Sequence, residues 1–109
     1  MVTGWLQVIP IVPLMECLEI APKKFDLTEA YLIMEGLTSL KPSDVQKLLE
    51  ACTSVKVKRL FLYFSEAANH SWFKYLDIDK INLGSGKRSI VKDGIYNEKY
   101  RITVPQKIN

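Results

Sequence analysis

The stretch that decides the fold is SVKVKRLFLYFSEAANH, residues 54–70, near the middle of a chain of 109 residues. Its apolar side chains recur at intervals of three and four, the spacing that places them on one face of an α-helix. We predict a buried stripe made of Val57, Leu60, Phe61, Phe64 and Ala68. Ser54 can cap the first turn of this helix through its hydroxyl, and Asn69-His70 marks its end.

Three cations, Lys56, Lys58 and Arg59, crowd the first turn of this predicted helix. The N-terminus is the positive end of the helix dipole, where an exposed cation is unfavourable by about 0.3–1 kcal/mol. Free amides and cations together make an anion site, so we interpret the cluster as a contact for an anionic group. Helical spacing also puts Lys56, Arg59 and Tyr63 on one face, opposite the apolar stripe. The alternative is that the helix begins later and the three cations lie in a solvated connection.

The segments around this helix predict a small α+β domain. Earlier helices are predicted over residues 14–20, from Asp26 to about residue 37, and from Pro42 to residue 52, because capping residues and apolar spacing coincide there. Ser71 can start a short helical turn through Trp72 and Phe73. Strands are predicted over residues 5–9, 87–91 and 100–104, the last two joined by a loop that contains Asp93-Gly94. We therefore expect central helices on a short, mostly antiparallel sheet formed by the chain ends.

Composition agrees with one ordinary folded domain, with 48% apolar and 25% charged residues. No apolar run approaches the roughly 20 residues that span a bilayer, so we expect a cytoplasmic protein without a membrane segment. Cys17 and Cys52 lie in apolar helical patterns and are expected to be reduced. Residues 1–50 hold four lysines and seven acidic residues (net −3), whereas residues 51–109 hold eleven Lys or Arg and five acidic residues (net +6). A basic second half favours an acidic partner.

The loop NLGSGKRSIVK, residues 82–92, combines glycines with Lys87 and Arg88 but does not fit a nucleotide-binding motif. A P-loop has a glycine five residues before its Gly-Lys pair and a Ser or Thr after it. Here Ile81 and Arg88 occupy those two places. The third glycine of a dinucleotide fingerprint is replaced by Ser89. We predict a turn that leads into a strand.

No pattern predicts an active site, a metal or a cofactor. His70 is the one histidine of the chain, and neither cysteine has a ligand-like neighbour. Trp72 beside His70 allows an exposed stacking patch, although Trp72 and Phe73 also suit the core. Asp77 and Asp79 resemble a nuclease carboxylate pair only faintly, and capping or surface roles account for them. We expect a protein that is not an enzyme, with the metal-dependent nuclease as the weakest alternative.

Residues 14–105 taken together resemble the C-terminal domain of AbiEi-type antitoxins, which belong to type IV toxin–antitoxin systems of abortive phage infection. The specific blocks are SVKVKRLF (54–61), LGSGKR (83–88) and ITVP (102–105), in that order and spacing. The resemblance implies an antitoxin that counteracts a nucleotidyltransferase-like toxin and contributes to repression of its own operon. In the family a winged helix precedes this domain. We expect residues 1–109 to be the C-terminal domain alone, with residues 1–12 as a junction that leaves no room for the winged helix.

The two basic clusters fall inside these specific blocks, so Lys56, Lys58, Arg59, Lys87 and Arg88 are the candidates for contact with an acidic partner or a phosphate. Tyr63 and His70 are possible accessory contacts. The expected partner is the cognate toxin. The alternative function is an accessory module that binds DNA or RNA through the basic half, and such binding would weaken as salt rises. The sequence sets no oligomeric state.

Overall fold

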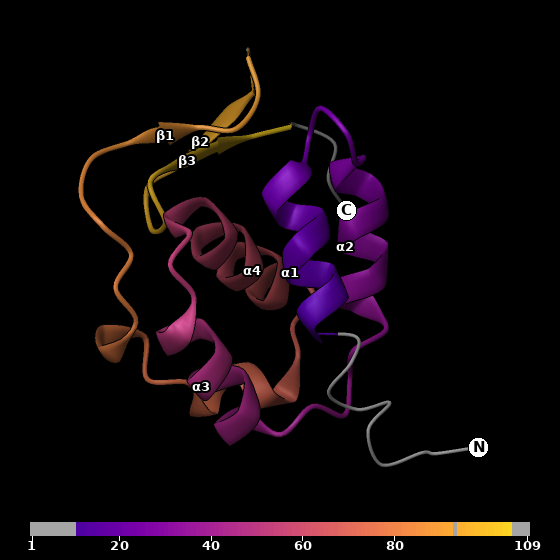
Figure 1. The fold of residues 1–109 in the computed structure, drawn as a ribbon, viewed down its shortest axis with the longest axis vertical. Coiled ribbons are helices and arrows are strands. Elements are labelled where there is room, and N and C mark those ends of the chain that lie inside the picture. Colours follow the sequence, from indigo (N-terminus) through magenta and orange to yellow (C-terminus); the bar gives the residue numbers. More distant parts are fainter. Residues whose placement is uncertain (1–10, 93, 106–109) are drawn as a thin grey trace.

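A computed structural model describes residues 11–92 and 94–105 (Figure 1). Four α-helices come first: α1 (Ile11–Ile20), α2 (Leu27–Glu35), α3 (Pro42–Ala51) and α4 (Val55–Ala67). Two short 3₁₀ helices follow at Ser71–Tyr75 and Ile78–Lys80. The described part ends with three short strands, β1 (Arg88–Ser89), β2 (Ile95–Asn97) and β3 (Ile102–Val104). The predicted α+β class is confirmed.

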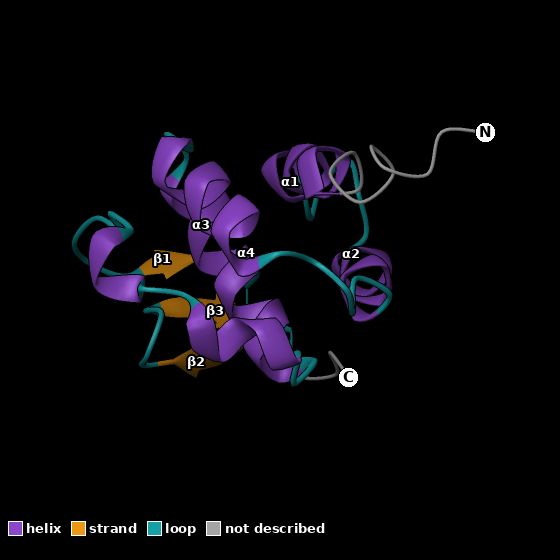
Figure 2. Ribbon diagram, turned by 90° about the horizontal axis from the view of Figure 1, so that it is seen from below, coloured by secondary structure: helices purple, strands orange, loops and turns teal. Residues whose placement is uncertain are grey.

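Helix α4 lies at the centre, between the α1–α2 pair on one side and the sheet on the other (Figures 1 and 2). The hydroxyl oxygen of Ser54 accepts a hydrogen bond from the Val57 amide at 3.2 Å, which is the predicted N-cap. Burial is almost complete along the predicted apolar stripe, including Leu60, Phe61 and Phe64. Because α4 carries large apolar side chains on most of its circumference, neighbours must cover it from several directions.

The predicted starts of α2 and α3 are also confirmed, whereas α1 begins at Ile11, three residues before the predicted start. The Asp26 carboxylate accepts a hydrogen bond from the Thr28 amide at 2.8 Å, and Pro42 occupies the first turn of α3. Proline suits that position because the first amides of a helix have no intrahelical partner. Both cysteines are free thiols. None of the described helices combines the length and the apolar character that a membrane-crossing helix has.

The sheet has the strand order β1-β3-β2, with β1 parallel and β2 antiparallel to β3. The predicted strands at 87–91 and 100–104 are present in shortened form, and β2 was not predicted. The sheet is therefore mixed in the described part of the chain, whereas a mostly antiparallel sheet was predicted. The predicted strand at residues 5–9 lies outside the described residues.

One face of the sheet is buried against the helical core, because Ile102 and Val104 of β3 are almost fully buried while Thr103 between them is partly exposed. This alternation is the two-residue period of a strand with one solvated face. The far end of α4 is joined to the β3 region by polar contacts. The Tyr100 hydroxyl donates to one Glu66 oxygen at 2.7 Å, and the Lys99 ammonium contacts the other at 2.8 Å.

These contacts predict an acid-sensitive element of stability. Burial by itself raises the pKa of Glu66, but the hydrogen bonds from Lys99 and Tyr100 outweigh burial and hold that pKa below its ordinary value of 4.5. A carboxyl whose pKa is lowered on folding stabilises the fold above the unfolded pKa, and this stabilisation is lost as pH falls through the folded pKa. Chemical unfolding at a series of pH values should therefore show stability falling below about pH 4.5, and Glu66→Gln should flatten that fall.

The matched control is Glu98→Gln, which removes an exposed carboxylate from the turn between β2 and β3. It should leave the acid limb of the stability curve as in the unaltered chain. Equal flattening in both variants would show that general charge, rather than the contact between Glu66 and Tyr100, sets the acid sensitivity.

Candidate basic interface

The glycine loop before β1 holds a buried arginine instead of a phosphate. The Arg59 side chain is 1% exposed and donates three hydrogen bonds. Its Nε donates to the Leu83 carbonyl at 2.8 Å, and its two terminal nitrogens donate to the carbonyls of Arg101 at 3.1 Å and Ser85 at 3.5 Å. A guanidinium has five N–H donors in a fixed planar fork, which suits several carbonyls that converge on one point.

The backbone of this loop depends on glycine. Gly84 has a φ of +71°, a conformation that side chains other than glycine rarely adopt. The Asn82 carboxamide oxygen accepts a hydrogen bond from the Gly84 amide at 2.9 Å, and Arg101 donates to the Gly84 carbonyl at 3.0 Å. The loop thus presents carbonyl oxygens to cations, whereas a phosphate loop presents amides to an anion. The prediction that this loop is not a nucleotide-binding loop agrees with this geometry.

Three arginines lie close enough to influence one another electrostatically. The pKa of Arg59 is lowered first by burial and then by the positive charges of Arg101 and Arg88, with Tyr96 acting in the opposite direction. Arg88 is exposed at β1, and Arg101 is partly exposed just before β3. The surface around this cluster therefore carries positive charge that the buried carbonyls do not cancel.

Lys56 has a structural partner at the other side of α4. Its ammonium donates to the Glu19 carbonyl at 2.7 Å, in the last turn of α1. The last carbonyls of a helix have no intrahelical partner and lie at the negative end of its dipole, so a cation is favourable there. The unfavourable position of Lys56 at the start of α4 is offset by this contact with the end of α1.

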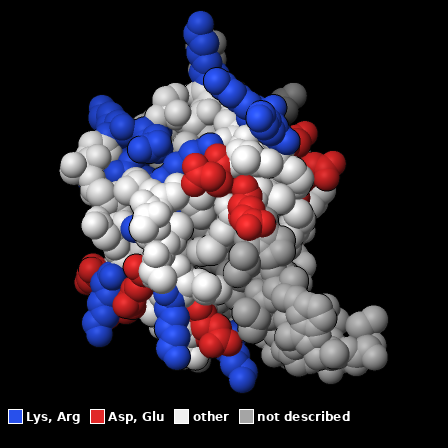
Figure 3. Space-filling view, in the orientation of Figure 1, with Lys and Arg blue, Asp and Glu red and all other residues white. Residues whose placement is uncertain are grey.

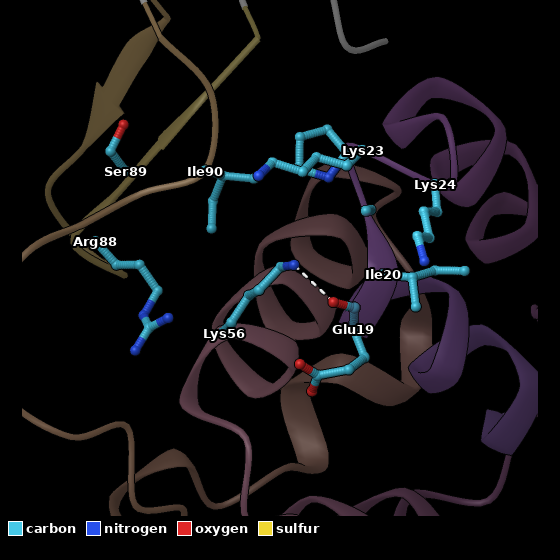
Figure 4. A pocket seen from close by; sticks show the side chains of 10 residues that line it. Glu19, Ile20, Lys23, Lys24, Lys56, Arg88, Ser89 and Ile90 are labelled. Carbon is cyan, nitrogen blue, oxygen red and sulfur yellow. Dashed lines mark hydrogen bonds between the residues drawn. The ribbon is translucent and has the colours of Figure 1, made fainter.

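A cleft of about 510 Å³ opens where the end of α1, the start of α4 and β1 meet. Its walls include four cationic side chains and one carboxylate: Lys23, Lys24, Lys56, Arg88 and Glu19. Figure 4 shows the ammonium groups and the guanidinium disposed around the hollow. Figure 3 shows Lys and Arg gathered over the upper part of this face, with acidic groups beside them. We call this feature the basic cleft.

Comparison with known proteins gives one family. The family model described as "Transcriptional regulator, AbiEi antitoxin, Type IV TA system" matches residues 8–105, which is nearly the whole chain. The chain belongs to the AbiEi antitoxin family. Neither the curated proteins nor the solved structures include a significant match.

Two of the three sequence blocks that resemble the AbiEi family meet at Arg59, and the third begins directly after one of its hydrogen-bond partners. The first block supplies the arginine, LGSGKR supplies the carbonyls of Leu83 and Ser85, and the third accepting carbonyl, that of Arg101, directly precedes ITVP. In this AbiEi family member the first two blocks are therefore parts of one tertiary contact, which also includes the residue before ITVP. That contact holds β1 and β3 against α4.

The structure brings together only some of the residues that were predicted as a contact surface. Lys56 and Arg88 line the basic cleft, and Lys87 is exposed next to Arg88. Lys58 and Arg59 are 4% and 1% exposed, so the expectation of one open basic face at the start of α4 is wrong. The glycine loop and the residue before β3 enclose Arg59. Helix α4 begins at Val55, which also excludes the alternative of a solvated connection.

The accessory candidates have core roles in this AbiEi domain. His70 is 8% exposed, its Nε2 lies 2.6 Å from the Met34 carbonyl, and its ring stacks on Trp72 at 4.9 Å. The alternative that this pair forms an exposed patch is therefore wrong. Tyr63 is half-buried beside Phe64, and burial raises the pKa of its phenol. In the described ranges no three His, Cys, Asp or Glu side chains lie close enough together to hold a metal ion.

Two cleft residues, Lys23 and Lys24, were missed in the sequence. They form a Lys-Lys pair after Pro22, in the turn between α1 and α2, and both are exposed. A pair of lysines in a turn is common on protein surfaces, so the signal alone was weak. Their significance comes from Lys56 and Arg88, which are distant in sequence and adjacent in the folded chain.

Proposed function

We propose that this chain counteracts a nucleotidyltransferase-like toxin, without catalysis of its own, and that the basic cleft is the surface through which it acts. The observation that supports the proposal is the cleft itself, where four cations from three separate segments surround one hollow with a single carboxylate on its walls. Membership of the AbiEi antitoxin family gives the class of function. The basic cleft is the feature of this domain that suits contact with an acidic partner.

Within this proposal the cationic residues have different tasks. Lys23, Lys24 and Arg88 are exposed and available to a partner. Lys56 is already bonded to the end of α1, and the buried Arg59 holds the wall that carries Arg88. We assign Lys87, which follows the glycine loop, to the rim of the same surface. Electrostatic complementarity of this kind favours fast association and correct orientation of the partner. We also propose that this chain contributes to the regulation of its own operon, which is a second activity of the family.

Growth rescue tests the proposal. The nucleotidyltransferase encoded beside this chain is expressed with the unaltered chain or with the triple variant Lys23→Glu, Lys24→Glu and Arg88→Glu. Each reversal places like charges against an acidic partner at a cost on the order of 1 kcal/mol, which together weakens binding roughly 100-fold. We expect the unaltered chain to restore growth and the triple variant to fail at equal protein level.

The matched control reverses three exposed lysines away from the cleft: Lys41→Glu, Lys47→Glu and Lys80→Glu. It changes the net charge by the same amount and should restore growth. Failure of both triple variants would assign the effect to net charge and contradict a role for the cleft. Failure of the unaltered chain to restore growth would contradict the antitoxin activity itself.

A further inference from the structure

The sheet has one face that the helices leave uncovered. In the register of the strands, Tyr96 of β2 and Ser89 of β1 both lie opposite Thr103 of β3, and directly opposed residues of neighbouring strands lie on the same face. Since the alternating residues Ile102 and Val104 are buried in the core, this row lies on the opposite, solvent-facing side. Figure 1 shows α4 on one side of the sheet and no described helix on the other.

An aromatic ring stands on this open face with a cation over it. Tyr96 is 37% exposed, and the Lys87 ammonium lies 5.4 Å from the centre of its ring. Lys87 directly precedes β1, and β3 separates β1 from β2, so the lysine side chain reaches across the middle strand. A large ring on a solvated strand face gains nothing from core packing on that side. It is available to stack with a planar ligand.

The charge around this ring is positive. Tyr96 is close enough to the buried Arg59 to affect its pKa. Arg88 lies opposite the buried Ile102 and therefore on the helix-facing side of β1, so Lys87 is the cation on the open face. Strand β1 forms one edge of the sheet, and its two residues, Arg88 and Ser89, also line the basic cleft. The open face and the cleft are therefore continuous at β1. The open face offers a stacking platform with Lys87 beside it, and the cations of the cleft lie around the β1 edge.

We propose that the open face of this sheet binds single-stranded nucleic acid, with a base stacked on Tyr96 and an adjoining phosphate held by Lys87. Single strands expose the flat faces of their bases, which stack on aromatic side chains, while cations follow the backbone. An acidic protein surface would use the cations but would not need the exposed ring. The two surfaces meet at β1 and share Lys87, but this binding depends on Tyr96 and needs no toxin, so it can be tested apart from the antitoxin proposal.

The chain offers a matched control for the aromatic–cation pair. Tyr75 is 68% exposed, and the Lys74 ammonium lies 5.3 Å from the centre of its ring. This pair has the same chemistry, but it lies at the end of a 3₁₀ helix, close in sequence to the carboxylates of Asp77 and Asp79. If any exposed tyrosine beside a lysine were enough, Tyr75 would contribute as much as Tyr96.

Fluorescence anisotropy of the purified full chain tests the proposal, with labelled RNA and DNA single strands of about 12 nucleotides as probes. We expect Tyr96→Leu to weaken binding about 5- to 150-fold, the range for loss of one stacked base. Tyr96→Phe should bind like the unaltered chain, because it keeps the ring, and Tyr75→Leu should also bind normally. A duplex of the same sequence should bind less tightly than either strand.

A second variant covers a possible loss of folding in Tyr96→Leu. Lys87 is exposed, so Lys87→Gln should leave the fold unchanged. It should reduce the slope of log affinity against log salt by about 0.7, as expected when one phosphate contact to a single strand is lost. Equal effects of Tyr96→Leu and Tyr75→Leu, equal affinity for duplex and single strand, or no binding at low salt would each overturn the proposal. Preference between the RNA and DNA probes identifies which nucleic acid the face accepts.

Discussion

Replacement of Arg59 by leucine is expected to lower the free energy of unfolding by about 3 kcal/mol, a large part of what a domain of this size possesses. The carbonyls of Leu83, Ser85 and Arg101 lose their donor, and each hydrogen bond to a charged group is worth about 1.5–3 kcal/mol. Part of this loss is recovered because leucine removes a buried charge that Arg88 and Arg101 repel.

The measurement is urea unfolding followed by tryptophan fluorescence, since Trp72 is buried in the core. Arg59→Lys should be intermediate, because an ammonium keeps the charge but cannot reach three separated carbonyls with the planar fork of arginine. The matched control is Arg88→Leu, the same change at an exposed position. It should alter stability by no more than about 0.5 kcal/mol.

Two outcomes would contradict this account of Arg59. A stability of Arg59→Leu equal to that of Arg88→Leu would mean that the carbonyls of the glycine loop find water instead. A fully stable Arg59→Leu that loses growth rescue would move Arg59 from the scaffold to the contact surface, as the sequence prediction had it.

Replacement of Gly94 by alanine is expected to cost about 3 kcal/mol and to detach β2 from the sheet. An added Cβ would overlap the Val104 carbonyl oxygen and lie 2.8 Å from the Val104 carbonyl carbon and from a Val91 methyl group. Two of these three atoms belong to the backbone of β3, so no change of rotamer removes the overlap. The strand pair Ile95–Val104 directly follows Gly94, and it must separate to make room.

Hydrogen exchange of the β2 and β3 amides, together with urea unfolding, measures this effect. Gly36→Ala is the matched control, because Gly36 ends α2 in a helical conformation with its nearest neighbour at an ordinary 3.5 Å. That change should be neutral or stabilising by up to about 1 kcal/mol. Normal protection of β2 in Gly94→Ala would show that the strand does not depend on the close approach of Gly94 to Val104.

The helices could be predicted because their signals are local. Ser54 and Asp26 cap the helices that follow them, and Pro42 starts α3, as the sequence indicates. A side-chain cap acts within three residues, and an apolar stripe repeats every three or four, so neither needs knowledge of the rest of the chain. The buried face of α4 and the α+β class followed from the same short-range information.

The pairing of the strands is decided by contacts between distant residues. Strand β2 has only three residues, Ile95–Asn97, too few for an alternating pattern to stand out. It pairs with β3 because Gly94 allows the close approach to Val104. Residues 87–91 and 100–104 were correctly predicted to contain strands, but their parallel arrangement depends on the insertion of β3 between β1 and β2. Register of this kind is a property of the folded chain and not of any one segment.

In the candidate interface, too, some features could be predicted from the sequence and others depend on tertiary packing. The sequence by itself indicated a basic second half, a loop that is not a nucleotide site, and the importance of the blocks around Arg59 and Lys87. Only the tertiary structure decides which cations meet a partner, because the exposure of a side chain depends on what packs over it. Arg59 is enclosed by carbonyls that lie 24 to 42 residues further along the chain, whereas Lys23 and Lys24 join Lys56 and Arg88 at one cleft. Charge can be counted from a sequence, but its accessibility is set by long-range packing.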